Sequence, residues 1–361
     1  MKYQLSSRQV CLFLIAFLPV TKIFILPSVL ASISSEDMWI SAIISLTIDF
    51  ITLIPVVFAC KKADKPFFQL LECTLGKVVS RVILILYFIY FMLKSIVPLN
   101  EQKDYVELTL YTLMPTVLYF IPFFFVAFYL CAKKLRVLGR AADVMWLITI
   151  VGFIILFALS VTNADFGAIL PIGAQGVSKV LSGSFNALNW FGDCVYIMFF
   201  IGEFKYSKKD TAKILLSFVL AAVLVIFFMV IFYCIFTSIA FRQRFALTEI
   251  SKYTTVINNL GRFDYIGILL ILFSNMVALS LPMYFSCRIL NRLFNIKNKW
   301  IAPILVVGCQ LAILLIFGRH FASIEYFMET FAGYFFIIMA NVLPIFSIFL
   351  TRRKNNEVQQ G

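Results

Sequence analysis

Three charged residues inside long apolar runs are the strongest candidates for chemistry in this sequence. Lys22 lies in "LPVTKIFILPSVL", between Pro19 and Pro27. Asp49 lies in "ISLTIDFITLI", and Asp193 lies in "NWFGDCV". A charge at the centre of a bilayer costs about 3 kcal/mol or more, so each of these residues is expected to find a partner or to serve a function.

Lys22 and Asp49 are expected to lie at similar depths. Lys22 follows Gln9 by about 13 residues, or roughly 20 Å of helix, and Asp49 lies about 10 residues, or roughly 15 Å, from the outer end of the next run. The two side chains are therefore predicted to meet. Two interpretations stay open: a structural ion pair, or a Lys22 that faces a central cavity and binds an anionic group or carries a proton.

Other polar residues inside apolar runs allow similar alternatives. Asp193 is a candidate for ligand or ion contact, or else it staples a helix break. Asn275, next to Ser274 in "ILFSNMVALS", is predicted either to line a cavity or to pack between helices. Lys94 is expected near the outer end of its run, where a lysine can extend its ammonium group to the membrane interface.

The composition identifies the elements that must position these residues. The chain has 361 residues, of which 62% are hydrophobic and 14% charged, and it contains 41 Phe. Runs of about 20 apolar residues predict an all-α polytopic membrane protein, because only helices or closed barrels satisfy the backbone in lipid and barrel strands are much shorter. No run is polar enough for an aqueous domain, so residues 1–361 are expected to form one transmembrane domain.

Several function classes are disfavoured. The chain has one histidine, no nucleophile elbow and no phosphate-binding loop, so an enzyme is not expected. The eight cysteines show neither metal-ligand spacing nor a disulfide framework, and no cofactor is expected. The net charge of +13 is attributed to topology and anionic lipid headgroups rather than to nucleic acid.

Hydropathy and helix breakers together predict ten transmembrane helices. The positive-inside rule places both termini in the cytoplasm, because most of the 31 Lys and Arg lie on the side of the termini. Two long outer loops, 163–186 and 237–261, are expected to hold short helices that cover an external vestibule. The predicted spans are 9–31, 38–59, 80–99, 115–132, 141–162, 187–204, 212–236, 262–287, 300–318 and 327–350.

Ten spans divide into a 5+5 inverted repeat, with repeat one at about 9–162 and repeat two at about 187–350. In transporters of this type the first helix of each half is often broken near the midplane, where freed backbone groups bind ligand. The first and sixth spans each contain a breaker and a charge, so helices 1 and 6 are the predicted broken helices.

Several segments resemble a known family. The stretch "KIFILP" is similar to the Gly-x-Gly-Ile-Phe-x-x-Pro break of amino acid–polyamine–organocation transporters, with Lys22 in place of the second glycine. The order and spacing of further segments resemble one branch of that superfamily, the spore germination permeases. These segments are "LSSRQ", "TKIFILPSVLA…MWISAIISLTIDF", "LGRAADV", "DFGAILPIGAQGVSKVLSGSF" and "NNLGRFDYIGILLILF".

The resemblance implies a B subunit of a nutrient germinant receptor in the spore inner membrane. Such a subunit binds a small nutrient, often an amino acid, and works beside an A subunit and a lipoprotein C subunit. The ligand pocket implied by the resemblance comprises Thr21, Lys22, Ile23 and Phe24 in the first break and Phe191, Gly192 and Asp193 in the second.

Lys22 departs from the family pattern, because a bulky cation replaces a small residue. Its ammonium group is expected either to neutralise a ligand carboxylate or to occupy the place of a coupling sodium ion, and the second alternative favours sodium independence. The leading hypothesis is a receptor whose two-state core passes a change to its partners. The alternative is a proton-coupled amino acid or polyamine transporter that uses Lys22 and Asp49. A purely structural subunit would not need charges at both breaks.

Overall fold

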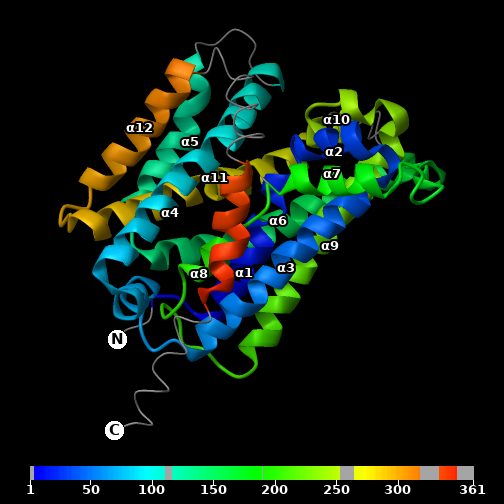
Figure 1. Ribbon diagram of the computed structural model, residues 1–361. Coiled ribbons are helices and arrows are strands. Elements are labelled where there is room, and N and C mark those ends of the chain that lie inside the picture. Colours follow the sequence, from blue (N-terminus) through cyan, green and yellow to red (C-terminus); the bar gives the residue numbers. More distant parts are fainter. Residues whose placement is uncertain (1–3, 110–115, 189, 253–263, 318–332, 348–361) are drawn as a thin grey trace.

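The computed structural model describes residues 4–109, 116–188, 190–252, 264–317 and 333–347, and within them the chain is built from helices (Figure 1). The only strand-like pairing in these ranges is an isolated bridge between Leu5 and Phe204. The predicted all-helical class is thus confirmed.

Five helical segments in the described ranges are long and apolar enough to cross a membrane, and three shorter apolar helices accompany them. The protein is therefore a multi-pass membrane protein. The long segments are Leu26–Lys62, Phe67–Glu107, Leu135–Asn163, Asp210–Arg242 and Ile268–Phe294, and the shorter ones are Phe120–Cys131, Ile301–Ile316 and Gly333–Ile345.

The α-helices differ widely in length, because several apolar runs are interrupted. Their bounds are α1 Ser7–Phe17, α2 Leu26–Ser34, α3 Met38–Lys62, α4 Phe67–Thr109, α5 Thr116–Cys131, α6 Leu135–Ser160, α7 Val177–Ala187, α8 Cys194–Met198, α9 Asp210–Phe236, α10 Ala246–Lys252, α11 Asp264–Phe294, α12 Ile301–Phe317 and α14 Leu343–Ile345. The short 3-10 helices include η1 Val20–Lys22, η2 Ser35–Asp37, η4 Phe166–Ile169 and η5 Thr237–Arg242, and a π-helix, η7, spans Ile338–Val342.

The first apolar run is broken between α1 and α2. Pro19 begins the 3-10 turn η1, and Pro27 lies in the first turn of α2, where a missing N–H costs nothing. Between them Ile23 has φ −109° and ψ 1°, outside the helical range. Two prolines eight residues apart therefore divide one span into two short helices.

A second break separates α7 from α8. Gly192 in this break has φ +90°, a conformation that favours glycine. A Cβ atom at this position would lie 2.5 Å from the Cβ of Ala340 in η7. Gly192 thus allows both the turn and the close approach of the last helices.

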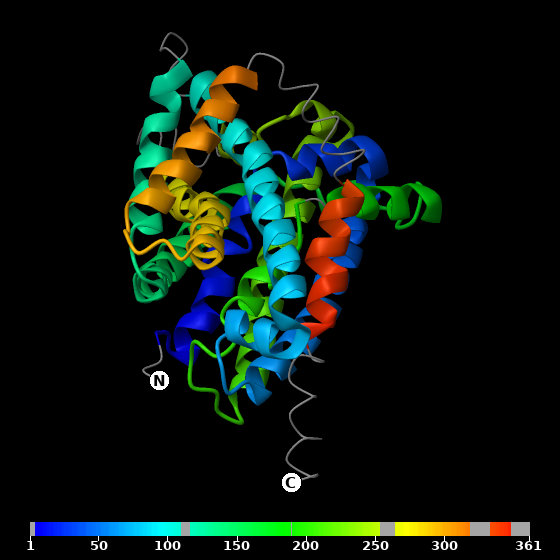
Figure 2. The ribbon, with the colours of Figure 1, turned by 60° about the vertical axis from the view of Figure 1, so that its left-hand side comes forward.

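The two breaks are brought together by helix packing. α1 contacts α6, α9 and α11, while α3 contacts α7, α8 and α9. The α3–α7 contact is close, because Ser41 and Ser45 donate hydrogen bonds to the carbonyls of Val180 and Ser184 at 3.0 and 2.9 Å. The short helices α2, α7 and α10 gather at one end of the molecule, and α12 lies beside α5 (Figures 1 and 2).

The third span is longer than the sequence prediction. The hydropathy pattern ends this span at residue 99, whereas α4 continues through Pro98 to Thr109. The polar residues of "EQKDY" are mostly buried in protein, since Glu101, Gln102 and Tyr105 are at most 4% exposed. Polar sequence here indicates an interior contact, not the membrane surface.

The two predicted outer loops contain short helices. Residues 163–186 include η4 and most of α7, and residues 237–261 include η5 and α10. Residues 253–261 of the second loop lie outside the described ranges, as do parts of the predicted spans that begin at 115, 262 and 327 or end at 318 and 350. The inverted repeat and the side of the termini stay predictions.

Candidate functional site

The ammonium group of Lys22 forms an ion pair with the Oδ2 atom of Asp193, which joins the two helix breaks. Lys22 is fully buried. Its Nζ also donates to the carbonyl of Leu18 at 3.0 Å and to the hydroxyl of Thr21 at 3.3 Å, and it lies 5.2 Å from the ring centroid of Phe191. Four groups from the two breaks therefore surround one cation.

The break supplies the Leu18 carbonyl because its backbone does not continue as an α-helix. In η1 the N–H of Lys22 bonds to the carbonyl of Pro19 at 3.1 Å, in a 3-10 pattern. The backbone N–H of Lys22 therefore does not bond to the Leu18 carbonyl. The Lys22 side chain bends back and donates to this carbonyl instead. The sequence thus places acceptor and cation on the same turn.

Asp49 has a different partner from the one predicted. Both of its carboxylate oxygens accept hydrogen bonds from the N–H of Gly192, at 3.1 and 2.9 Å, and its side chain is fully buried. In addition, its backbone carbonyl accepts a bond from the thiol of Cys194 at 3.1 Å. Asp49 in α3 therefore holds the second break.

The predicted direct pairing of Lys22 with Asp49 is replaced by the Lys22–Asp193 pair. Within the described residues no ion pair joins Lys22 to Asp49. Depth along the two helices is compatible with contact, but the break between α7 and α8 inserts Gly192 and Asp193 between the lysine and the α3 carboxylate. Each carboxylate thereby receives one partner of its own.

Lys94 is a second cation at this place. Its Nζ donates to the carbonyl of Phe191 in the second break and lies 5.7 Å from the ring centroid of Tyr90. The expectation that Lys94 reaches the interface is wrong, because α4 continues 15 residues beyond it, about 22 Å. No acidic group within the described ranges forms an ion pair with Lys94, which is half-buried.

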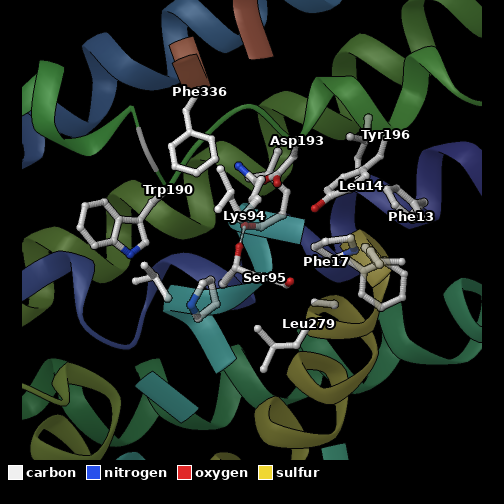
Figure 3. Close-up of a pocket in the computed structure, with 18 residues that line it drawn as sticks. Phe13, Leu14, Phe17, Lys94, Ser95, Trp190, Asp193, Tyr196, Leu279 and Phe336 are labelled. Carbon is white, nitrogen blue, oxygen red and sulfur yellow. Dashed lines mark hydrogen bonds between the residues drawn. The ribbon is translucent and has the colours of Figure 1, made fainter. Parts of the chain in front are cut away.

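A cavity of about 70 Å³ adjoins the two breaks. Figure 3 shows Trp190 and Phe336 on one side of it and Phe17 and Tyr196 on the other, with Lys94 between them. The volume is enough for several water molecules. The lining comprises Phe13, Leu14, Phe17, Leu18, Thr21, Leu93, Lys94, Ser95, Val97, Pro98, Trp190, Asp193, Tyr196, Ala278, Leu279, Leu281, Pro282 and Phe336.

The predicted site residues take different places around this cavity. Thr21 and Asp193 line it, whereas Lys22, Phe191 and Gly192 lie in the breaks behind that lining. Ile23 is fully buried and belongs to the hydrophobic core.

Two further predicted residues line a smaller void beside the cavity. Phe24 and Asn275 both border it, and the Nδ2 of Asn275 donates to Oε1 of Gln102 at 2.5 Å. The backbone carbonyl of Phe24 accepts a bond from the N–H of Ala246 at the start of α10.

Sequence reasoning missed most of the aromatic lining. Phe13, Trp190, Tyr196 and Phe336 come from three separate apolar runs, and nothing in a sequence with 41 Phe distinguishes the aromatic residues that face a cavity. Lys94 carried a usable signal, since it is a cation inside an apolar run.

This arrangement is suited to the binding of a small ligand. Aromatic walls enclose an apolar space, and a few polar groups at one side can orient a small ligand, as in typical binding pockets. No group of three or more His, Cys, Asp or Glu side chains that could hold a metal occurs in the described part of the chain.

The fold and this cavity define the class of protein. It is a polytopic helical membrane protein with a transporter-like fold, because it is similar to the solved structures of a manganese transporter from Eremococcus coleocola. Two variants of that transporter align with TM-scores of 0.60 and 0.59, at 10% identity, over 95% of this chain and 78% of theirs.

The family follows from the sequence comparisons. The family model described as "Spore germination protein" matches residues 4–326, and the chain belongs to this family. It is also 23% identical over 310 residues to spore germination protein KB of Bacillus subtilis (strain 168), which covers 82% of this chain and 80% of that protein. The resemblance seen in the sequence is confirmed.

Proposed function

We propose that this chain is the nutrient-sensing subunit of a spore germination receptor and that its ligand is a small, amino-acid-like molecule with a carboxylate. Membership of the spore germination protein family supports the receptor role. The observation that carries the ligand class is the Lys94 ammonium group, which borders an aromatic cavity and has only a carbonyl as hydrogen-bond partner among the described residues.

The distribution of charges explains why Lys94, and not Lys22, is the ligand's anchor. Lys22 is fully buried and is neutralised by Asp193, and Asp49 is held by a backbone N–H. Lys94 thus contributes a positive charge with which no described side chain forms an ion pair. A ligand carboxylate that enters the cavity would supply the missing anion, and hydrogen bonds between charged groups are the strong ones.

The Asp193 carboxylate is a binding partner for the ammonium group at the other end of the ligand. Its Oδ2 pairs with Lys22, and the residue lines the same cavity as Lys94. A ligand ammonium group would face this carboxylate while its carboxylate faces Lys94. A zwitterion thereby matches the polarity of the cavity at both ends.

Lys22 itself takes the role of a built-in cation. Its ammonium group lies where the two breaks meet and is bound by a carbonyl, a hydroxyl and a carboxylate. These are the ligand types that bind sodium, so we propose that sodium is not required. A divalent metal ion such as manganese would meet two ammonium groups here, which disfavours it as a substrate.

The signal would leave through partner subunits. We propose ten transmembrane helices in a single domain, with inverted repeats at about 9–162 and 187–350. The protein would lie in the spore inner membrane, with both termini on the cytoplasmic side. Ligand binding would shift the two broken helices relative to the rest and pass this change to an A subunit and a lipoprotein C subunit.

One experiment tests the ligand class. The purified protein in detergent is heated in the presence of single amino acids, their amides, their decarboxylated amines, sugars and nucleosides. A ligand that binds only the folded state raises the melting temperature. We expect stabilisation by at least one amino acid and none by its amide or amine. Stabilisation by the amine would contradict the assigned role of Lys94.

Transport is the second candidate function, and the fold favours it, because the similar solved structures are transporters. Reconstituted liposomes with a proton gradient and the stabilising amino acid in labelled form distinguish the two. Binding without accumulation supports a receptor, whereas accumulation above the equilibrium level supports a proton-coupled amino acid transporter. Two ammonium groups at the site disfavour a polyamine.

A further inference from the structure

A second, smaller void lies beside the main cavity. It measures about 10 Å³, and Thr21, Pro98 and Leu279 line both spaces. The void's own lining adds Phe24 and three polar side chains, Glu101, Gln102 and Asn275. The polar side chains come from α4 and α11, which pack against each other.

These polar groups are buried but not fully paired. Gln102 and Asn275 are 1% and 3% exposed, and the Nδ2 of Asn275 donates to the Oε1 of Gln102 at 2.5 Å. Among the described residues, the Nε2 of Gln102 and the Oδ1 of Asn275 have no hydrogen-bond partner. A buried polar atom without a partner is destabilising, so this unused donor and acceptor lower the stability of the protein when no ligand is bound.

The presence of this unused donor and acceptor does not depend on how the amide groups are oriented. If both amides were turned by 180°, Gln102 would donate to Asn275, and the unused pair would be the Asn275 amino group and the Gln102 carbonyl. In either orientation the two side chains that line the void carry one N–H donor and one carbonyl acceptor without a partner among the described residues. A hydroxyl group, which accepts and donates at once, satisfies both.

The size of the void selects among polar groups. About 10 Å³ is close to the minimum that holds a single water molecule, so a hydroxyl fits and a carboxamide or a carboxylate does not. Glu101 adds a carboxylate whose Oε1 accepts a bond from the Nε1 of Trp190 at 3.2 Å. Since Trp190 lines the main cavity, the two spaces are also connected through this contact. A carboxylate close by disfavours an anionic group.

We infer that Gln102 and Asn275 form a specificity subsite that recognises a hydroxyl group of the ligand held in the main cavity. This inference rests on the proposed function and refines it, because it assigns a hydroxylated member of the ligand class. The ligand's carboxylate faces Lys94, and its hydroxyl group enters the side void past Thr21 and Leu279. A ligand without the hydroxyl leaves the buried donor and acceptor unpaired.

The test uses pairs of probes that differ by a single hydroxyl group. The pairs are L-threonine with L-valine and L-serine with L-alanine, and the dissociation constants come from thermal stabilisation of the full-length purified protein. We expect the hydroxylated member of at least one pair to bind about tenfold or more tightly, the equivalent of one buried hydrogen-bonding group.

Matched variants assign the preference to the subsite. The double variant Gln102→Met/Asn275→Leu removes the donor and the acceptor together, so that neither amide is left unpaired, and we expect the preference to fall below about threefold. The control is Gln310→Met on α12. This substitution also removes a fully buried amide without partners among the described residues, but Gln310 lines neither the cavity nor the void. The control variant should keep the preference for the hydroxylated probe. If the double variant does not fold, Gln102→Met alone serves, with an expected loss of the same sign.

The outcomes separate the two levels of the proposal. Binding of probes with no hydroxyl preference in the unaltered protein, or a preference that persists in the double variant, overturns the subsite and leaves the proposed function standing. If no probe of any kind binds, the proposed function fails, and the subsite fails with it.

Discussion

Lys22 and Asp193 form a buried ion pair that ties the break in the first apolar run to the break in the sixth. The two residues are 171 positions apart in the chain. Lys22 is fully buried and Asp193 is 7% exposed, so water contributes little to the stability of either charge. The relative position of the two broken helices therefore depends on this contact.

Neutralising one partner should destabilise the protein strongly. Lys22→Met leaves the Asp193 carboxylate, and Asp193→Asn leaves the ammonium group, without a counter-ion, and we expect each to cost about 3–5 kcal/mol of unfolding free energy. The double variant should lose less than the sum of the two. Thermal unfolding of the purified proteins in detergent measures this coupling.

A second pair and a second cycle serve as controls. Arg8→Gln breaks an ion pair with Asp143 in which Arg8 is 74% exposed, and it should cost about 1 kcal/mol or less. A second double-mutant cycle combines Lys22→Met with Asp49→Asn. Its coupling energy in unfolding should be smaller than that of Lys22→Met with Asp193→Asn. Equal coupling in both cycles, or strict additivity for Lys22 and Asp193, would refute the ion pair as described.

Gly192→Ala should be among the most damaging small substitutions. It introduces a Cβ both at φ +90° and 2.5 Å from the Cβ of Ala340, so strain and overlap add, and we expect a loss of about 3 kcal/mol or more in thermal unfolding.

Two other glycines separate these effects. Gly76→Ala meets the same type of backbone strain at φ +78° without any neighbour within 4 Å, and it should cost about 1 kcal/mol. Gly308→Ala, in the middle of α12 with open space around it, should be neutral or stabilising by up to about 1 kcal/mol. If Gly192→Ala were as mild as Gly76→Ala, the close contact with Ala340 would not exist.

The helix breaks were predictable from the sequence because their causes are local. Proline removes a backbone donor, and glycine permits a positive φ. The helices are therefore interrupted at Pro19, Pro27 and Gly192 for reasons that do not depend on tertiary contacts. The membrane class followed in the same way from the length of the apolar runs.

The contacts at the site were not predictable to the same extent. Rise per residue gives the depth of Lys22 and Asp49, but it does not give the direction in which each helix turns its side chains, and Asp193 took the expected place of Asp49. Lys94 was misplaced because the polar segment after Pro98 was interpreted as the membrane surface. Glu101 and Gln102 are instead buried against α11 and the second break, which hydropathy alone does not indicate.

Lys94 should behave in the opposite way to Lys22. Lys94→Met removes a half-buried cation that has no acidic partner among the described residues. We therefore expect the free energy of unfolding to be unchanged or slightly higher than in the unaltered protein. Binding of the stabilising amino acid, in contrast, should weaken by about 10- to 100-fold, the contribution of a hydrogen bond to a charged group. Titrations followed by thermal shift measure both quantities.

Matched lysine variants complete this test. Lys94→Arg keeps the charge and should retain part of the affinity. Lys103→Met on the same helix removes an ammonium group that pairs with Asp104 at 2.7 Å and Glu107 at 3.2 Å, away from the cavity, and it should not change ligand affinity. An unchanged affinity in Lys94→Met would remove this lysine from the site.

Asp37 should control the order of the segment that leads into α7. This fully buried carboxylate, next to the start of α3, accepts hydrogen bonds from the backbone N–H groups of Gly173 and Gln175 at 2.7 and 3.0 Å. Asp37→Ala removes the buried acceptor of these two backbone N–H groups, and we expect a loss of about 2 kcal/mol and faster proteolysis between residues 166 and 176. Asp165→Ala is the control, because among the described residues Asp165 accepts a single hydrogen bond, from the N–H of Gly167 at 2.9 Å, and it is exposed, so that its loss should cost about 1 kcal/mol or less. Limited proteolysis followed by mass spectrometry locates the cleavage, and equal cleavage rates in the two variants would show that Asp37 does not hold this segment against α2 and α3.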